Sequence, residues 1–371
     1  MNSADPTRAA ADPEVTCRVS IIIKALNEER NIAATIESAL RAAATVASEV
    51  VLADSCSTDA TVELATRYPV RIAQLAHAGE RCCGVGPQLG YQHSNGEFIF
   101  VMDGDMLLRA GFLEQALAFL VAHPQAAGVG GFVVERNTAS LEYAARIERK
   151  PAHLAAGQVD RLDGGGLYRR SAIEAAGYLS DRNLHAYEEF DLAARLRALN
   201  WQLWRLPVPA VDHFGHDEPP YRLLMRRWRS RYAWGLGELI RAAVGRPHLH
   251  LVLRGLRELY LYILVLIWWL VLVSVPLWPL SAPLRIGAFC TLVVIPMMLM
   301  VWRKRSADKA LYSVASWCVN AAGLVCGVLR PRQPVRDPVP SRVLLDRVGS
   351  APQSSRHANS SGDASRFVRS C

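Results

Sequence analysis

The stretch Glu97-Phe98-Ile99-Phe100-Val101-Met102-Asp103-Gly104-Asp105 decides how the rest of the chain can be organised. Its apolar, aromatic and β-branched run follows a turn signal at residues 94–96 and predicts a buried strand. The run ends in two carboxylates that repel each other unless a cation lies between them. A hard divalent cation is one answer, because such ions bind carboxylate oxygens together with substrate phosphates. The other answer is that Asp103 and Asp105 only stabilise the start of a helix near residue 110.

Strand and helix patterns alternate on both sides of this stretch. Apolar and β-branched runs predict strands over residues 18–26, 49–53, 71–76, 129–134 and 201–206. Apolar residues at helical spacing predict helices over residues 31–44, 58–68, 110–123, 141–154 and 192–199. This alternation predicts an α/β fold with a mostly parallel sheet and helices on both of its faces.

Polar side chains follow several of the predicted strands. Asn27 and Glu28 come after the first strand, Asp54 after the second, and Asp103 and Asp105 after the fourth. In parallel sheets, ligands bind beyond the carboxyl ends of the strands. The shared placement therefore favours metal binding over helix capping for the two aspartates.

Two further motifs lie between residues 160 and 200. Three glycines, 164–166, precede Tyr168 and Arg169. Such a run lets a ligand approach the backbone closely, although an ordinary glycine-rich turn fits it equally well. Glu188, Glu189 and Asp191 open a strong helix, where acids suit the positive end of the helix dipole. One of the three is therefore expected only to stabilise the helix.

The C-terminal third has the pattern of a membrane protein. Residues 221–243 are amphipathic and arginine-rich, which favours a helix in the membrane interface over a core helix with a basic face. Residues 259–280 and 284–302 approach the ~20 apolar residues that span a bilayer. Basic residues flank this pair, which predicts a hairpin with both ends in the cytosol. Residues 310–329 are less apolar and fit a third span, a re-entrant helix or an interfacial helix.

Charge and cysteine content narrow the class of protein. The net charge is +8, and residues 222–257 contain nine arginines but a single acid, Glu238. A basic cluster before apolar spans indicates a membrane face rather than a nucleic-acid site, and no nucleic-acid-binding motif accompanies it. The eight cysteines form no Cys-x-x-Cys pair, so neither a zinc site nor a disulfide framework is indicated. The polar first 16 residues lack the apolar core of a secretory signal, so the catalytic part is expected in the cytosol.

In order and spacing, these motifs resemble a membrane-bound family-2 glycosyltransferase with the GT-A fold, over about residues 19–243. Residues 19–29 resemble its opening strand and nucleotide-binding loop, although many members have proline where this chain has Lys24. Residues 51–61 resemble the second strand, whose acid contacts the nucleotide base. Asp103-Gly104-Asp105 matches the metal-binding Asp-x-Asp motif, and residues 188–192 resemble the Glu-Asp-x-Asp-Leu motif. Leu224 replaces the glutamine of the Gln-x-x-Arg-Trp motif of processive members, which weakens a processive-synthase interpretation.

The resemblance implies a set of site residues. The nucleotide-sugar donor would be bound by Asn27, Glu28, Asp54, Arg81, Gln88 and Asp103. A divalent metal, Mg²⁺ or Mn²⁺, would be held by Asp103, Asp105 and His213. The catalytic base would be Glu189, with Glu188 as the alternative because the usual residue at position 189 is aspartate. The acceptor side would include Gly165, Gly166, Arg169, Arg227 and Trp228.

The implied function is metal-dependent, inverting transfer of a sugar from a nucleoside-diphosphate sugar to a membrane-associated acceptor. The acceptor would be lipid-linked or a polysaccharide, as in exopolysaccharide or glycolipid assembly, where polysaccharide-assembly proteins are candidate partners. A polyprenyl-phosphate sugar transferase is the alternative enzyme, and a non-catalytic membrane scaffold is the alternative outside catalysis. The expected location is the inner or plasma membrane, with several spans and a cytoplasmic catalytic domain.

The expected organisation divides the chain into five parts. Residues 1–16 are predicted to be disordered, residues 17–215 to form the GT-A catalytic domain, and residues 216–257 to form the basic interface region. Residues 258–330 are predicted to form the transmembrane region, with two firm spans and a third left open. The tail, residues 331–371, is rich in Pro, Ser and Arg and is predicted to be disordered.

Overall fold

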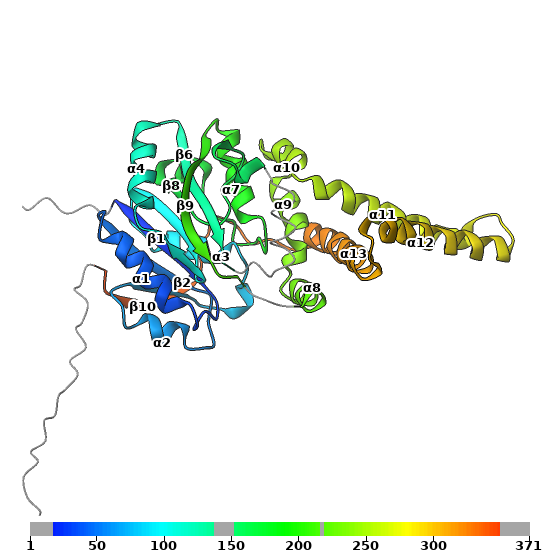
Figure 1. The fold of residues 1–371 in the computed structure, drawn as a ribbon, viewed down its shortest axis with the longest axis horizontal. Helices are drawn as coiled ribbons and strands as arrows, with labels where there is room; N and C mark the ends of the chain where they lie inside the picture. Colours follow the sequence, from blue (N-terminus) through cyan, green and yellow to red (C-terminus); the bar gives the residue numbers. More distant parts are fainter. Residues whose placement is uncertain (1–17, 137–151, 216–218, 349–371) are drawn as a thin grey trace, which may run out of the picture.

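The computed structural model describes residues 18–136, 152–215 and 219–348, and centres on one ten-stranded sheet (Figure 1). The strand order is β10-β3-β2-β1-β4-β8-β6-β9-β5, with β7 paired to β9. The strands are β1 (Val19–Ala25), β2 (Ser48–Asp54), β3 (Arg71–Leu75), β4 (Phe98–Asp103), β5 (Met106–Leu108), β6 (Ala126–Glu135), β7 (Gly157–Val159), β8 (Gly166–Arg169), β9 (Gln202–His213) and β10 (Ser341–Asp346).

The α/β prediction is confirmed, but the sheet is mixed rather than mostly parallel. The pairs β1–β2, β2–β3, β1–β4 and β6–β9 are parallel. Strands β5, β7, β8 and β10 join their neighbours antiparallel. The parallel centre arises because helices connect its strands, as parallel neighbours require a crossover. The ends of β1, β2 and β4 therefore meet at one edge of the sheet.

Helices cover both faces of the sheet, as expected. One face packs against α1 (Ile32–Ala43), α2 (Thr61–Ala65) and α4 (Phe112–Ala122). The other packs against α3 (Val85–Gln92), α6 (Arg170–Ala176) and α7 (Glu188–Ala198). Side chains alternate along β1, so Ile21 and Ile23 join the first core while Ile22 joins the second. Single turns of 3₁₀-helix occur at η1 (Ala78–Glu80) and η2 (Ala152–Leu154).

The C-terminal part is helical and projects away from the sheet (Figure 1). It consists of α8 (Pro220–Arg229), η3 (Tyr232–Trp234), α9 (Gly235–Ala243), α10 (Leu249–Gly255), α11 (Arg257–Ser274), η4 (Val275–Leu277), α12 (Ala282–Lys304) and α13 (Ala307–Leu329). The amphipathic segment predicted over 221–243 is two helices, because the chain turns at Arg231, whose φ is 62°. Three stretches, Arg257–Leu277, Ala282–Lys304 and Ala307–Leu329, are long and apolar enough to cross a membrane.

Two predicted elements differ from the structure in extent. The helix predicted over 58–68 is limited to α2, whereas the strand predicted over 201–206 extends to His213 as β9. Most of the helix predicted over 141–154 lies outside the described residues.

The prediction of a disordered tail from residue 331 is wrong for the residues that the structure describes. Ser341–Asp346 form β10, which pairs antiparallel with β3 at the edge of the sheet. The preceding segment also binds the domain, since Gln92 exchanges hydrogen bonds with the backbone of Val339. Composition suggested disorder because the segment has few apolar side chains, but a strand that joins a sheet edge gains backbone hydrogen bonds that composition does not report.

Candidate active site

Strand register brings the first acid of the Asp-x-Asp motif against a lysine. Lys24 on β1 is the register partner of Asp103 on β4, and its Nζ lies 2.9 Å from the Oδ1 of Asp103. Gly104 then lies directly against the loop that follows β1. A Cβ at this position would lie 2.8 Å from the Cγ of Glu28. A larger residue than glycine would therefore push the β1–α1 loop away from the Asp-x-Asp turn.

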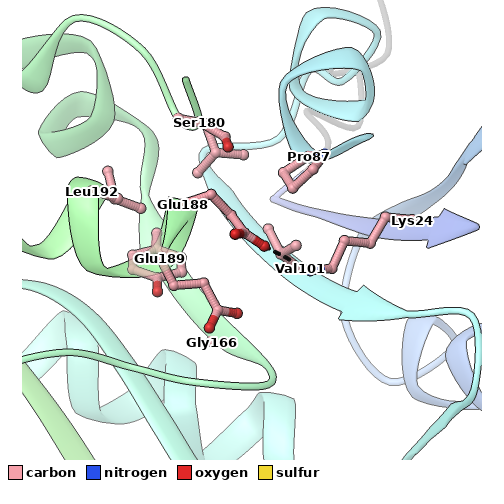
Figure 2. Close-up of a pocket in the computed structure, with 10 residues that line it drawn as sticks. Lys24, Pro87, Val101, Gly166, Ser180, Glu188, Glu189 and Leu192 are labelled. Carbon is pink, nitrogen blue, oxygen red and sulfur yellow. Dashed lines mark hydrogen bonds and ion pairs between the residues drawn. The ribbon is translucent and has the colours of Figure 1, made fainter. Parts of the chain in front are cut away.

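Lys24 also reaches the opposite side of the site. Its Nζ lies 3.4 Å from the Oε1 of Glu188, so one ammonium links the Asp-x-Asp turn to the first residue of α7 (Figure 2). Burial works to lower the pKa of Lys24, but Asp103, Glu188 and Glu189 together raise it well above its usual value. The lysine is therefore a fixed positive charge among carboxylates.

The two candidate bases begin α7 after Tyr187, which has a left-handed φ of 68°. The Oε1 of Glu189 accepts a hydrogen bond of 3.2 Å from the backbone N–H of Gly164. Burial raises the pKa of Glu189 to about 8, against the lowering effect of Lys24 and with help from the nearby acids Asp163, Glu188 and Asp103. A carboxyl group with such a pKa can gain and lose a proton near neutral pH, as a general base must.

Asp191 has the structural role expected for one acid of this helix. It is fully buried, and its Oδ2 accepts a hydrogen bond of 2.8 Å from the Nε of Arg195 one turn later. This ion pair links two consecutive turns of α7.

Glu188 and Glu189 border a small pocket with Lys24 on its other side (Figure 2). The remaining lining comes from four elements and their loops, and consists of Pro87, Val101, Gly166, Tyr168, Leu179, Ser180 and Leu192. The pocket therefore joins the carboxyl end of β1 to the glycine-rich segment and to the start of α7.

Asp105 belongs to a second charged group. Its Oδ2 lies 3.4 Å from the Nε2 of His213, whose Nδ1 lies 2.8 Å from the Oε2 of Glu135. The hydrogen bond with Asp105, opposed by burial and reinforced by Glu135, raises the pKa of His213 to about 9. Asp105 therefore has a cationic neighbour in this structure, held in place by Glu135.

The predicted metal ligands are only partly brought together. Among residues 18–136, 152–215 and 219–348, no three His, Cys, Asp or Glu side chains are grouped closely enough to hold a metal ion. A divalent cation that also binds substrate phosphates needs only one or two carboxylates from the protein. Asp105 and Asp103 fit that smaller donor set. His213 would have to lose its second proton before it could become a ligand.

The nucleotide side of the site is built from two interlocked loops. Asn27 has a φ of 59°; its N–H donates to the Oγ of Ser57, and its Oδ1 accepts from the N–H of Thr58. The N–H of Glu28 donates to the Oγ1 of Thr61 at 2.7 Å. These bonds fix the loop after β1 to the loop after β2.

Asp54 offers an unused acceptor between these loops. It is fully buried, and its Oδ2 accepts hydrogen bonds from the side chain of Gln74 and the backbone of Ser57. Its Oδ1 is buried without a hydrogen-bond partner in the described part of the chain. Because a buried carboxylate oxygen normally has a partner, this atom fits a ligand donor such as the N–H of a nucleotide base.

Two of the predicted donor residues hold neighbouring backbone. The guanidinium of Arg81 donates to the carbonyl oxygens of Ser55 and Cys56. The Oε1 of Gln88 accepts a hydrogen bond of 3.0 Å from the N–H of Ser180, which lines the pocket. Both residues lie beside the site and shape it, while the structure shows their polar groups engaged with the protein.

The acceptor-side residues divide into two groups. Gly165 and Gly166 lie at the start of β8; Gly165 has a φ of 102°, and Gly166 lines the pocket. Arg169 points elsewhere, because it donates to the carbonyl of Leu120 and stacks over the ring of Phe98. It therefore supports the packing of α4 and is not brought to the site.

Arg227 and Trp228 lie on α8, outside the pocket. The guanidinium of Arg227 lies 5.2 Å from the ring centre of Tyr232, and Trp228 packs edge-on against Trp234 with ring centres 6.0 Å apart. They connect α8 to the turn before α9 rather than to Glu188 and Glu189.

Two residues at the site were not predicted as site residues from the sequence. In the sequence, Lys24 stands out only because many members of the family that the chain resembles have proline at this position. Glu135 ends β6 and is the register partner of His213 on β9. The available signal for Glu135 is its position directly after the predicted strand 129–134, because Asp54, Asp103 and Asp105 also lie at strand ends.

Comparisons with known proteins give the family and the fold that this chain resembles. Residues 20–180 match the family described as Glycosyl transferase family 2. Over 191 residues the chain is 30% identical to EpsE of Bacillus subtilis (strain 168), whose name describes it as a glycosyltransferase. That match covers 48% of this chain and 66% of EpsE, just under two thirds of its length.

Two solved structures extend the comparison. The mannosyltransferase PcManGT from Pyrobaculum calidifontis, in complex with GDP-Man and Mn²⁺, superimposes with a TM-score of 0.51 at 19% identity, over 86% of this chain and 90% of that one. TarS 1–349 from S. aureus, in complex with UDP-GlcNAc, has a TM-score of 0.46 at 14% identity, over 84% and 90%. The family match over residues 20–180 and the fold shared with PcManGT confirm the resemblance to a glycosyl transferase family 2 domain over that part of the chain.

Proposed function

We propose that this protein transfers a sugar from a nucleoside-diphosphate sugar to a hydroxyl group of a membrane-associated acceptor, with inversion at the anomeric carbon. The ion network of Lys24 carries the proposal. It joins Asp103, a donor-side acid, to Glu188, the residue beside the candidate base, within 2.9 and 3.4 Å. This supports donor and acceptor chemistry on either side of one small pocket.

On the donor side, the free Oδ1 of Asp54 would accept a hydrogen bond from the nucleotide base. Asn27 and Glu28 would position the nucleoside, since their loop is hydrogen-bonded to the loop that follows Asp54. Asp105 and Asp103 would hold a divalent cation together with the diphosphate. When bound, that ion would neutralise the charge that develops on the departing diphosphate. The Mn²⁺ and GDP-Man bound by PcManGT support this assignment.

On the acceptor side, Glu189 would remove the proton from the attacking hydroxyl group. The acceptor oxygen forms a bond to the anomeric carbon as the bond from that carbon to the diphosphate oxygen breaks. The proton ends on a carboxylate oxygen of Glu189, and the electron pair leaves with the nucleoside diphosphate. One displacement of this kind inverts the anomeric configuration, and the N–H of Gly164 would keep Glu189 oriented during the step.

The apolar helices support a membrane-associated acceptor. Three stretches that could cross a bilayer follow the catalytic domain, and α8 carries Arg222, Arg226, Arg227 and Arg229 beside them. An anionic, lipid-linked acceptor of polysaccharide or glycolipid assembly suits such surroundings. The charge pattern supports a catalytic domain on the cytosolic side.

Donor binding to the detergent-purified protein tests the proposal. UDP-, GDP- and dTDP-sugars would be titrated with Mg²⁺, with Mn²⁺ and with excess chelator, alongside Asp105→Ala. We expect binding of one nucleotide class that requires metal and is lost in the variant. Equal binding in chelator would contradict the metal role, and no binding across the panel would contradict donor use. Normal transfer in both Glu189→Gln and Glu188→Gln would favour a lipid-phosphate acceptor, which needs no base.

A further inference from the structure

The contacts made by both ends of the apolar region indicate how the chain crosses the membrane. The beginning of α11 is anchored to the catalytic domain, because the Tyr187 hydroxyl donates a hydrogen bond of 3.2 Å to Glu258. Leu256 and Leu259 are buried in the same apolar cluster as Phe190 of α7. The chain therefore enters the apolar region from the side of the membrane on which the catalytic domain lies.

The end of α13 returns to that same domain. Arg330, directly after α13, donates a hydrogen bond of 2.6 Å to Glu238 and also contacts the Nδ1 of His185 at 2.8 Å. Arg332 then pairs with the fully buried Asp181. Farther along, β10 adds itself to the edge of the sheet beside β3. The chain therefore leaves the apolar region on the side from which it entered.

A chain that starts and finishes on one side of a bilayer crosses it an even number of times. Helices α11 and α12 form a hairpin that projects from the domain, joined by a hydrogen bond of 2.9 Å from the Trp268 indole to the carbonyl of Leu292 (Figure 1). The 23 residues of α12 measure about 34 Å along the helix axis, enough for the ~30 Å hydrocarbon layer. These two helices are the crossing pair.

Helix α13 packs closely on the catalytic side. A Cβ at Gly323 would lie 2.2 Å from the carbonyl oxygen of Ala233, and one at Gly327 would lie 2.1 Å from that of Trp234. From α9, the guanidinium of Arg241 donates to the carbonyl of Val328 at 2.6 Å. Because Gly323 and Gly327 have no side chain, α13 can lie directly against η3 and α9, which belong to the domain side.

The other face of α13 is apolar and exposed. Leu311, Val325 and Leu329 are 52%, 41% and 71% exposed, and their separations of 14 and 4 residues place them on one face of the helix. Tyr312 packs edge-on against Tyr221 of α8 at 5.4 Å between ring centres, so α8 and α13 lie together. Helix α13 adjoins both helices of the hairpin, and arginines of α8 suit anionic lipid headgroups.

We infer that the protein crosses the bilayer twice, through α11 and α12, and that α13 lies with α8 in the membrane interface on the side of the catalytic domain. The partner of the exposed face of α13 is the lipid headgroup and acyl-chain boundary. Of the three alternatives that the sequence left open for residues 310–329, this inference selects the interfacial helix.

Cysteine labelling of the full-length protein in sealed vesicles tests this topology. Single cysteines would be placed by Glu63→Cys in the catalytic domain, Ser281→Cys between α11 and α12, and Asp337→Cys after α13, in a variant that lacks the natural cysteines. Glu63, Ser281 and Asp337 are all exposed. A membrane-impermeant maleimide would be applied to inside-out and right-side-out vesicles, and detergent-opened vesicles would show that each cysteine can react.

We expect Glu63→Cys and Asp337→Cys to react in vesicles of the same orientation, and Ser281→Cys to react only in the opposite one. Reaction of Asp337→Cys together with Ser281→Cys would establish α13 as a third crossing and overturn the inference. Reaction of all three in one orientation would show that no helix crosses, which also overturns it. None of these outcomes depends on sugar transfer, so the topology stands or falls separately from the proposed activity.

Discussion

The pH dependence of transfer gives the sharpest test of the proposed base. Glu189 has a pKa of about 8 because burial and three neighbouring acids disfavour its charged form more than Lys24 favours it. A base acts only when deprotonated. About 9% of Glu189 would be ionised at pH 7 and about 91% at pH 9, so kcat/KM should rise about tenfold between these values.

The assay measures kcat/KM for the nucleotide sugar between pH 5.5 and 9.5, because this quantity reports the protonation state of the free enzyme. Below the pKa, the rate should fall about tenfold for each pH unit, and we call this fall the acidic limb of the profile. Glu189→Gln keeps the size of the side chain and removes the base, so transfer should fall by about 10²–10⁴-fold and the residual rate should lose this acidic limb. Glu188→Gln, one residue away, is the matched control and should keep the limb, moved to lower pH because Glu188 is one of the acids that raise the pKa of Glu189.

Two results would refute the reasoning. A flat profile from pH 6 to 9 would mean that no group with a pKa near 8 must be ionised. An acidic limb that survives in Glu189→Gln but disappears in Glu188→Gln would transfer the role of base to Glu188. Circular dichroism of both variants across the same range would exclude unfolding as the cause of lost activity.

Three further predictions concern charge, nucleotide binding and helix packing. Lys24→Met removes the group that lowers the pKa of Glu189, so the acidic limb should move up by about one pH unit or more; an unmoved limb would contradict the Lys24 network. Asp54→Asn should weaken nucleotide binding about tenfold in calorimetry, as the loss of a hydrogen bond to a charged group predicts, and unchanged affinity would remove Asp54 from the donor site. Gly237→Ala should destabilise the protein by about 1–3 kcal/mol, because its Cβ would lie 2.1 Å from the carbonyl oxygen of Leu324. The control Gly287→Ala meets no atom within 4 Å and should be neutral or stabilising in the same thermal or denaturant unfolding assay.

The sequence by itself determined the class of fold and the polar edge of the sheet. Apolar runs of strand length and helical spacing are local patterns, and they predicted β1, β4 and α7 close to where the structure has them. The acids of the Asp-x-Asp motif were found in the same way, because a carboxylate directly after a buried strand is visible in the linear chain. The long apolar runs also predicted the α11–α12 hairpin from length and flanking charge alone.

Tertiary structure decided which distant residues meet. Lys24 reaches Asp103 because β1 and β4 pair in one particular register, and Glu135 reaches His213 because β6 pairs with β9. Arg169 resembled an acceptor-side residue, yet its direction follows from the packing of α4 on β4 and β8. No local pattern encodes these contacts, because register depends on the sum of many weak pairings between separate strands.

The C-terminal region shows the same division. Hydropathy identified three helices, but it could not count the crossings, because a helix that spans a bilayer and one that lies along it can have similar composition. The contacts of Arg330 and Arg332 with Glu238 and Asp181, together with β10, return the chain to the catalytic domain. These residues are separated from their partners by 92 to 151 positions, and only the folded chain brings such charges into contact.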